Sequence, residues 1–109
     1  MTINKAYVGK WRITEMEQWD KDYIDMVVPG HLTIGDDGMG SLQFGAVEAE
    51  VDCRVESLGG VERLEFSFEG EDEGDPVCGR ACVQVTGRTM TGRIYFHMGD
   101  DSGFTASKK

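Results

Sequence analysis

The sequence has no long apolar run, few cysteines and a shortage of basic residues. No stretch of its 109 residues approaches the 18 or so consecutive apolar residues of a membrane-spanning helix. The N-terminus lacks the basic-then-apolar order of a signal peptide. We therefore expect a cytoplasmic protein with no membrane partner.

The three cysteines are Cys53, Cys78 and Cys82, an odd number without a Cys-x-x-Cys pair. This excludes both a disulfide framework and a zinc ribbon. Cysteine serving as a small hydrophobic residue in a reducing compartment is the favoured interpretation. We expect neither a metal nor another cofactor.

Lysine and arginine number 11 against 20 aspartates and glutamates, so the net charge is −9. This balance disfavours nonspecific attraction to nucleic acids and to anionic membranes. Acidity commonly serves solubility, and acidic mimicry of nucleic acid towards a basic partner is the alternative. The length predicts a single domain over residues 1–109, large enough for one hydrophobic core.

Alternating apolar and polar residues dominate the chain and predict strands. The clearest is Val47–Ser57, where valine, alanine and cysteine alternate with acidic residues and Arg54. The other expected strands are Ala6–Thr14, His31–Gly35, Met39–Ala46, Val61–Glu69, Val77–Thr86, residues 90–98 and a short one at Phe104–Ala106.

Tight turns separate these strands. Asp36–Gly38, Gly59–Gly60 and Gly87–Arg88 have hairpin-turn chemistry, which makes sequential strands antiparallel neighbours. We expect a solvated loop over Gly70–Pro76 and a frayed tail at Lys108–Lys109. We predict a small, mainly-β up-and-down barrel of about eight strands with a filled interior, the alternative being a two-sheet sandwich.

One helical segment is expected after the first strand. Thr14–Glu17 has capping-box spacing, and Met16, Trp19, Tyr23 and Val27 recur at helical intervals. Asp20 is an alternative N-cap of a shorter helix, and either version stops at Pro29–Gly30. The segment is able to close one end of the barrel.

Gly9-Lys10-Trp11 resembles the Gly-x-Trp signature that opens the first strand of lipocalins and related barrels. The resemblance implies that Gly9 and Trp11 form a structural plug at the closed end. In that family a cation from the last strand covers the tryptophan, and Lys108 or Arg93 fits this role.

Longer strings resemble a group of small bacterial proteins of uncharacterised function. They are Trp11–Met16, Trp19–Asp25, Glu65–Gly70, Gly79–Arg80 and Phe96–Ser102. This resemblance implies a bacterial cytosolic protein and carries no activity with it.

Two groups of residues look able to do chemistry or bind. His97 beside Asp100 and Asp101 could act as an acid or base or help bind a metal, although short carboxylates also serve turns. Arg80, Arg93, Tyr95 and His97 share the faces opposite the apolar rows of two strands, and could bind an anion or partner or form salt bridges.

Trp19 and Tyr23 lie one helical turn apart and form either a lid over the core or a recognition surface. The candidate binding residues are therefore Trp19, Tyr23, Arg80, Arg93, Tyr95, His97, Asp100 and Asp101.

No catalytic constellation is complete, so the sequence favours a non-enzymatic protein that binds a small molecule or a protein, as a monomer or homodimer. One alternative is a small metal-dependent or acid/base enzyme using His97 with Asp100 and Asp101. The other is an acidic inhibitor or regulator of another bacterial or phage protein.

Overall fold

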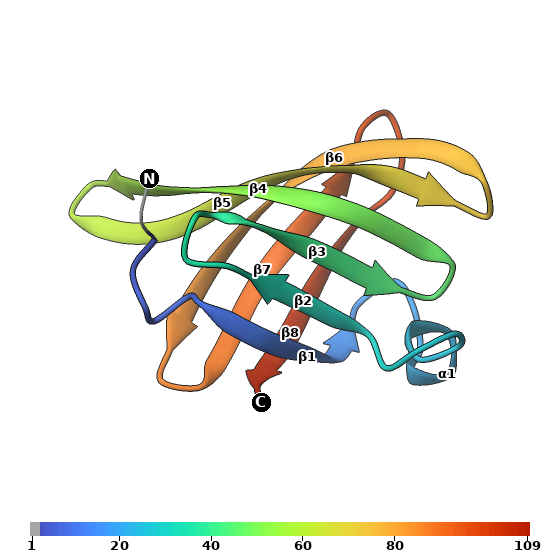
Figure 1. Ribbon diagram of the computed structural model, residues 1–109, viewed down its shortest axis with the longest axis horizontal. Coiled ribbons are helices and arrows are strands. Elements are labelled where there is room, and N and C mark those ends of the chain that lie inside the picture. The colour runs from blue at the N-terminus through green and yellow to red at the C-terminus, as the bar shows by residue number, and fades with distance from the viewer. Residues whose placement is uncertain (1–2) are drawn as a thin grey trace.

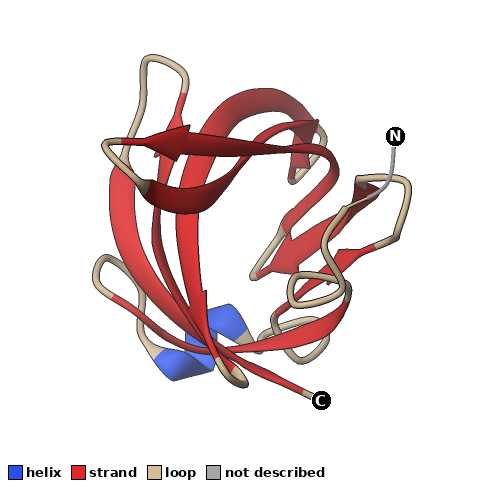
Figure 2. Ribbon diagram, turned by 90° about the vertical axis from the view of Figure 1, so that its left-hand side faces the viewer, coloured by secondary structure: helices blue, strands red, loops and turns tan. Residues whose placement is uncertain are grey.

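The computed structural model describes residues 3–109 and shows a closed barrel of eight antiparallel strands (Figure 1). Each strand pairs with the next along the chain, and β8 closes the barrel by pairing with β1 (Figure 2). The expected up-and-down barrel is confirmed, and the two-sheet sandwich is not formed. The strands are β1 Gly9–Met16, β2 His31–Ile34, β3 Met39–Phe44, β4 Val47–Leu58, β5 Val61–Asp72, β6 Asp75–Thr86, β7 Thr89–Phe96 and β8 Asp101–Lys108.

The two-residue alternation of the strands separates the core from the surface. In β4, Val47, Val51 and Cys53 point inward and are buried, whereas the acidic residues between them point outward. Every strand contributes at least one side chain to a single hydrophobic core. Among residues 3–109, no helix is long and apolar enough to cross a membrane.

The loop expected over Gly70–Pro76 was wrong, because this segment forms the hairpin between β5 and β6. The two strands run on to Asp72 and from Asp75, and only Glu73 and Gly74 form the turn, both with positive φ. Although the composition is typical of a loop, cross-strand pairing supplies the backbone with partners while the carboxylates remain in water. The barrel wall is therefore longer on this side.

The helix is also shorter than the spacing from Met16 to Val27 predicts. Strand β1 continues to Met16 because β8 pairs with it, with a bulge between Ile13 and Glu15. Helix α1 covers only Lys21–Ile24. Its N-cap is Asp20, whose carboxylate accepts a hydrogen bond from the Tyr23 N–H at 2.9 Å, so the start of the shorter helix is confirmed. The expected end at Pro29–Gly30 was wrong, because the helix ends at Ile24.

Because the barrel closes, the first and last strands have different bounds from those expected. Strand β1 begins at Gly9 rather than Ala6, and β8 covers residues 101–108 rather than only 104–106. The C-terminal residues are not frayed, because the Lys109 N–H donates to the Lys10 carbonyl at 2.9 Å. The last strand gains these partners only when it meets the first.

We call the end of the barrel around Trp11 the plugged end. The Trp11 side chain is 0% exposed, and its indole N–H donates to the Tyr7 carbonyl at 2.9 Å. Lys108 is the cation above it, with Nζ 5.4 Å from the ring centroid, whereas Arg93 lies elsewhere. The Tyr7 hydroxyl donates to Glu62 at 3.0 Å, and burial together with this bond raises the pKa of Tyr7 to about 12.

Candidate functional site

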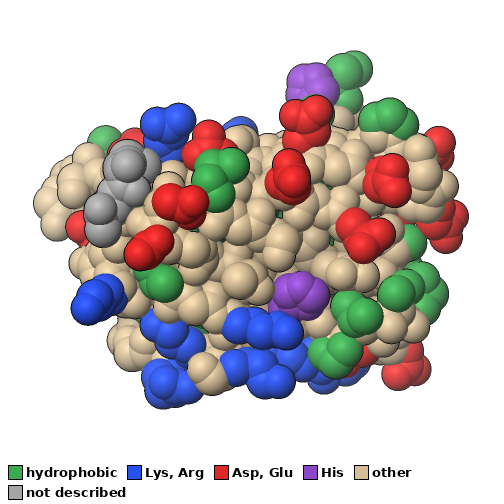
Figure 3. Space-filling view, viewed as in Figure 1, with side chains coloured by type: hydrophobic (Ala, Val, Ile, Leu, Met, Phe, Trp, Pro, Cys, Tyr) green, Lys and Arg blue, Asp and Glu red, His purple; other side chains and the backbone are tan. Residues whose placement is uncertain are grey.

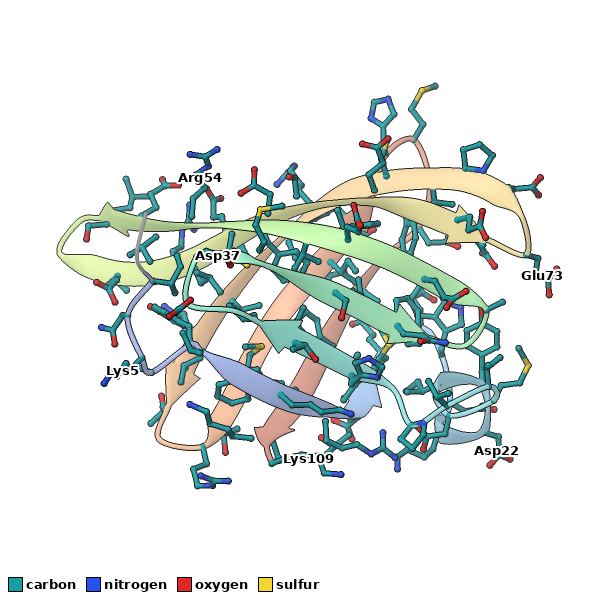
Figure 4. All side chains as sticks on the ribbon, in the orientation of Figure 1. Lys5, Asp22, Asp37, Arg54, Glu73 and Lys109 are labelled. Carbon is teal, nitrogen blue, oxygen red and sulfur yellow. The ribbon has the colours of Figure 1, made fainter. Side chains whose placement is uncertain are left out.

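A cleft opens at the other end of the barrel, beside α1 and the β5–β6 hairpin. In Figure 4, Asp22 and Glu73 mark this end, and Lys5 and Arg54 mark the opposite one. We call it the mouth cleft, and its volume is about 670 Å³. Its lining residues are Trp19, Tyr23, Val47, Glu69, Gly70, Asp72, Pro76, Val77, Cys78, Phe96, His97, Gly99 and Asp100.

Aromatic rings form the floor of the mouth cleft. The Trp19 ring lies at the centre, with its centroid 5.2 Å from that of Phe44 and 6.1 Å from that of Phe96. Tyr23 stacks on Trp19 at 6.2 Å, and Phe68 meets Phe96 edge-on at 5.2 Å. The phenylalanines of β3 and β5 are buried, but the other three rings are only half-buried and line the cleft.

Backbone fit and hydrogen bonds fix Tyr23 and the α1 segment. Gly45 has φ +56 and donates its N–H to the Ile24 carbonyl at 2.9 Å. A Cβ at this glycine would lie 2.2 Å from Cε2 of Tyr23, so only glycine lets the ring sit here. The aromatic wall therefore depends on a close backbone approach as well as on ring packing.

An ion pair ties the same segment to the barrel. The Arg12 guanidinium donates to both carboxylate oxygens of Asp25, at 2.8 and 2.7 Å. The Gly30 N–H donates to the same carboxylate at 2.9 Å. These bonds, that of Arg12 first, hold the pKa of Asp25 well below its usual range. These bonds hold the α1 segment, which carries Tyr23, against the barrel.

The charges around the mouth cleft are of one sign. Glu69, Asp72 and Asp100 line it, together with His97, and the described residues of its lining include no lysine or arginine. The protein as a whole carries a net charge of −9. An apolar floor with carboxylates around it is therefore the chemical character of this cleft.

A second hollow, the outer groove, runs over the outside of β4 to β7 with a volume of about 920 Å³. The residues that line both hollows are Glu69, Cys78, Phe96 and His97. The exposed Cys78 adjoins His97, whose backbone N–H donates to the Cys78 carbonyl at 2.8 Å. Further along the groove the Arg80 guanidinium lies 4.5 Å from the Tyr95 ring centroid. The two hollows thus meet at a polar ridge.

The structure divides the residues predicted to bind. Trp19, Tyr23, His97 and Asp100 come together at the mouth cleft, and Arg80, Tyr95 and His97 line the outer groove. Arg93 and Asp101 belong to neither, because the Arg93 Nε donates to the Asp101 carboxylate at 2.8 Å. Arg93 also pairs with Glu17 at 3.2 Å, so salt bridges are its role rather than an open anion site.

The three residues of the alternative acid/base arrangement, His97, Asp100 and Asp101, do not line one site. Asp101 lies in β8 instead of the polar turn, with its carboxylate on Arg93. His97 and Asp100 line the mouth cleft without it. Over residues 3–109, no group of three or more histidine, cysteine, aspartate or glutamate side chains is placed to hold a metal ion.

Several cleft residues were not among the predicted site residues. Asp72 enters the cleft because β5 extends through the segment expected to be a loop, whereas Glu69 and Val77 lie at the ends of strands that were predicted. Strand alternation assigns Phe96 to the core, yet it lies at the end of β7 and is only half-buried. No apolar alternation runs through Gly70–Asp72, so the sequence carried no signal for Asp72.

Comparison with protein-family models, with curated proteins and with solved structures finds no match to this chain. The role of the cleft therefore has to come from its own chemistry.

Proposed function

We propose that this protein is a non-enzymatic binding module that takes a small, flat, largely apolar molecule into the mouth cleft. The observation that carries the proposal is the row of half-buried rings of Trp19, Tyr23 and Phe96 along a cleft of about 670 Å³. Ligand sites are typically concave, lined by apolar and aromatic groups and of this size. Aromatic surface left open to water is the feature that a bound ligand would cover.

The plugged end supports the same proposal. Trp11 beneath Lys108 agrees with what the lipocalin-like Gly-x-Trp resemblance implies for a closed end. The Trp11 and Tyr7 side chains at that end are buried, whereas the half-buried rings of Trp19, Tyr23 and Phe96 lie at the opposite end, which we therefore propose as the entry. We accordingly propose a lipocalin-like use of the barrel, with the ligand at its mouth.

The expected affinity is moderate. A ligand of about 20 non-hydrogen atoms gaining about 0.3 kcal/mol per atom would bind with a Kd of tens of micromolar. The Gly45 and Asp25 contacts hold the α1 segment in place, so little ordering cost is added on binding. Ring stacking adds about 0.5–1.5 kcal/mol per well-oriented pair beyond the area that is buried.

The cysteines provide a test that does not require the natural ligand. Cys78 is exposed and lines the mouth cleft, whereas Cys82 is half-buried outside it. Cys53 is buried, and burial raises the pKa of its thiol to about 12, so it should not react. Iodoacetamide labelling followed by peptide mass spectrometry measures each thiol separately.

We expect 2-(1-naphthyl)ethanol to slow alkylation of Cys78 and to leave the rate at Cys82 unchanged. Trp19→Ala should remove this protection, and Trp19→Phe should retain part of it because a ring remains. Tyr95→Ala, which changes the outer groove and the groove beside Cys82 but not the mouth cleft, is the matched control and should keep full protection of Cys78. Equal protection of both thiols, or protection that survives Trp19→Ala, would contradict binding in the mouth cleft.

The acidic outer face of β4 and β5 favours a second candidate function, docking to a basic protein as an acidic regulator. Two arginines lie among its carboxylates, Arg54 and Arg63. A hydrogen bond to Glu56 raises the pKa of Glu65, a sign of how closely these acids crowd. The carboxylates of the two strands are Glu48, Glu50, Asp52, Glu56, Glu62, Glu65, Glu69, Glu71 and Asp72.

This second function predicts a salt-sensitive partner. A protein captured from bacterial extract should dissociate at an ionic strength of about 0.5 M, because screening removes contacts between exposed charges. Glu48→Lys with Glu50→Lys should abolish capture while leaving the protection of Cys78 by naphthylethanol intact. Capture that is unchanged by both treatments would exclude the acidic face as the contact.

A further inference from the structure

We infer that the ligand of the mouth cleft is an amphipathic organic cation, with an aromatic or branched apolar body joined to a protonated or quaternary amine. The inference rests on the proposed function and names the ligand class for that same cleft. The observation behind it is that carboxylates and aromatic rings line the same cleft. The three acidic residues of the lining are Glu69 and Asp72 on β5 and Asp100 on the turn before β8.

These three carboxylates are uncompensated. Within residues 3–109, none of them takes part in a salt bridge, although Asp25 and Asp101 elsewhere are firmly paired with arginine. The described part of the lining contributes no lysine or arginine to balance them. Unbalanced acidic groups around a low-dielectric floor focus a negative potential on the opening, which concentrates cations and repels anions.

The aromatic floor of the mouth cleft also favours a cationic ligand, but through a different interaction. An ammonium or methylated ammonium group within about 6 Å of a ring face is attracted by the ring quadrupole, most strongly for tryptophan. The Trp19 and Tyr23 rings stack on each other, are half-buried and line the same cleft as those carboxylates. The apolar part of the ligand can then cover Val77 and Phe96, which also line the cleft.

Two other hollows differ from the mouth cleft because arginine lines them. The outer groove includes Arg80. A groove over β5 to β7 is lined by Arg63, Arg80 and Arg93. A further groove over β2 to β5 is also acidic and has no lysine or arginine in its described lining, but no tryptophan or tyrosine lines it. The combination of carboxylates with half-buried tryptophan and tyrosine rings therefore distinguishes the mouth cleft from these three hollows.

A series of three closely similar probes tests the inference. They are 2-(1-naphthyl)ethylamine, 2-(1-naphthyl)ethanol and 1-naphthylacetate, which carry a positive charge, no charge and a negative charge on the same ring. Binding is measured by isothermal titration calorimetry, and its location by protection of Cys78 relative to Cys82. We expect the amine to bind about tenfold more tightly than the alcohol, and the acetate more weakly still.

The carboxylates are tested directly with isosteric amides. Asp72→Asn with Asp100→Asn should lower the affinity for the amine about tenfold and leave that for the alcohol unchanged. The control is Asp36→Asn with Glu48→Gln, which removes the same net charge at residues outside the cleft lining. This control should keep the preference for the amine within about twofold, since remote exposed charges are screened.

The possible results separate this inference from the proposed function. If all three probes protect Cys78 equally and Trp19→Ala abolishes the effect, the cleft binds ligands and the cationic class is wrong. If none of them protects Cys78, the proposed function itself is wrong. If the amine binds but the control pair weakens it as much as the cleft pair, the attraction is a general surface effect and the inference is overturned.

Discussion

The two tryptophans lie in different parts of the barrel and are held in different ways. Trp11 is fully buried, its indole N–H is bonded to Tyr7 and Lys108 covers its ring. Trp19 is half-buried among other rings and borders the mouth cleft. The residue type is the same, but the first position completes the core while the second leaves apolar surface available to a ligand.

Charge differs between regions of the surface as well. Figure 3 shows lysine and arginine side chains gathered along the lower side of the molecule, with aspartate and glutamate over the upper part. Lys10, Lys108 and Lys109 lie together at the seam where β8 meets β1, while the acidic residues crowd β4 and β5. A net charge of −9 therefore describes no single face of this protein.

The difference between the two tryptophans is tested most strongly by replacing each of them in turn. Trp11→Ala should lower the free energy of unfolding by about 3–5 kcal/mol, because it leaves a cavity in a fully packed site. Trp19→Ala should cost roughly half as much, since part of that ring already contacts water. Urea unfolding followed by circular dichroism measures both. Equal losses would mean that the mouth is packed as tightly as the plug.

A pair of glycine substitutions tests how the mouth is held. Gly45 and Gly59 have similar φ values, +56° and +59°, but an added Cβ would strike the Tyr23 ring at the first and meet nothing within 4 Å at the second. Gly59→Ala should cost about 1 kcal/mol of stability from backbone strain alone. Gly45→Ala should cost about 1–3 kcal/mol more, because the ring must move.

The same pair has a second readout in thiol labelling. Gly45→Ala should also weaken the protection of Cys78 by naphthylethanol, since Tyr23 lines the cleft. Gly59→Ala should leave that protection unchanged. If both variants lose stability equally and protection is kept, the close approach of Gly45 to the ring does not shape the cleft.

The ion pair between Arg12 and Asp25 makes the α1 segment sensitive to acid. Because the pKa of Asp25 is lowered in the folded state, its stabilisation is complete above about pH 4, the ordinary range of an aspartate. It is lost as the pH falls towards the lower folded value. Asp25→Asn should cost about 1–2 kcal/mol at pH 7, and less below pH 4.

Chemical unfolding at pH 7 and at about pH 3 measures this difference. Asp22→Asn, which changes an exposed carboxylate of the same helix, is the control and should show little effect at either pH. If Asp25→Asn lowers the free energy of unfolding equally at both pH values, the residue contributes through its shape rather than its charge.

The smallest effect is expected at the plugged end, from the hydrogen bond between Tyr7 and Glu62. The pKa of Tyr7 is raised to about 12, so its contribution is present below about pH 10 and is lost as the pH rises through the folded value. Tyr7→Phe should cost about 1 kcal/mol. Absorbance at 295 nm should show a late tyrosinate step that Tyr7→Phe removes and Tyr23→Phe retains.

Much of the barrel was predictable because local rules and the final fold agree. The alternation in β4 and the glycines at residues 59 and 60 each specify strand faces or a turn without reference to the rest of the chain. The helix and the acidic hairpin were predicted less well. In both, strand pairing satisfied backbone groups that composition and spacing alone assign elsewhere, with the distant β8 in the first case and within the β5–β6 hairpin in the second.

The candidate site was predicted in part. Trp19, Tyr23, His97 and Asp100 do share a cleft, but the sequence offered no reason to separate them from Arg93 and Asp101. The outward faces of β6 and β7 follow from alternation, and the predicted Gly87–Arg88 turn already sets Arg80 opposite Tyr95. The register of β7 with β8, which no predicted two-residue turn fixes, brings Arg93 within reach of Asp101 on the next strand.

The sequence by itself determined the strand faces and most of the turns, because each depends on residues close together in the chain. It also determined the net charge and a length sufficient for one core, which depend on composition and size alone. Only the tertiary structure decided which strand closes the barrel, how far β1, β5, β6 and β8 extend, and which carboxylates remain without a cationic partner. The reason is physical: pairing, burial and charge compensation are properties of residues far apart in the chain, and they exist only once the barrel has closed.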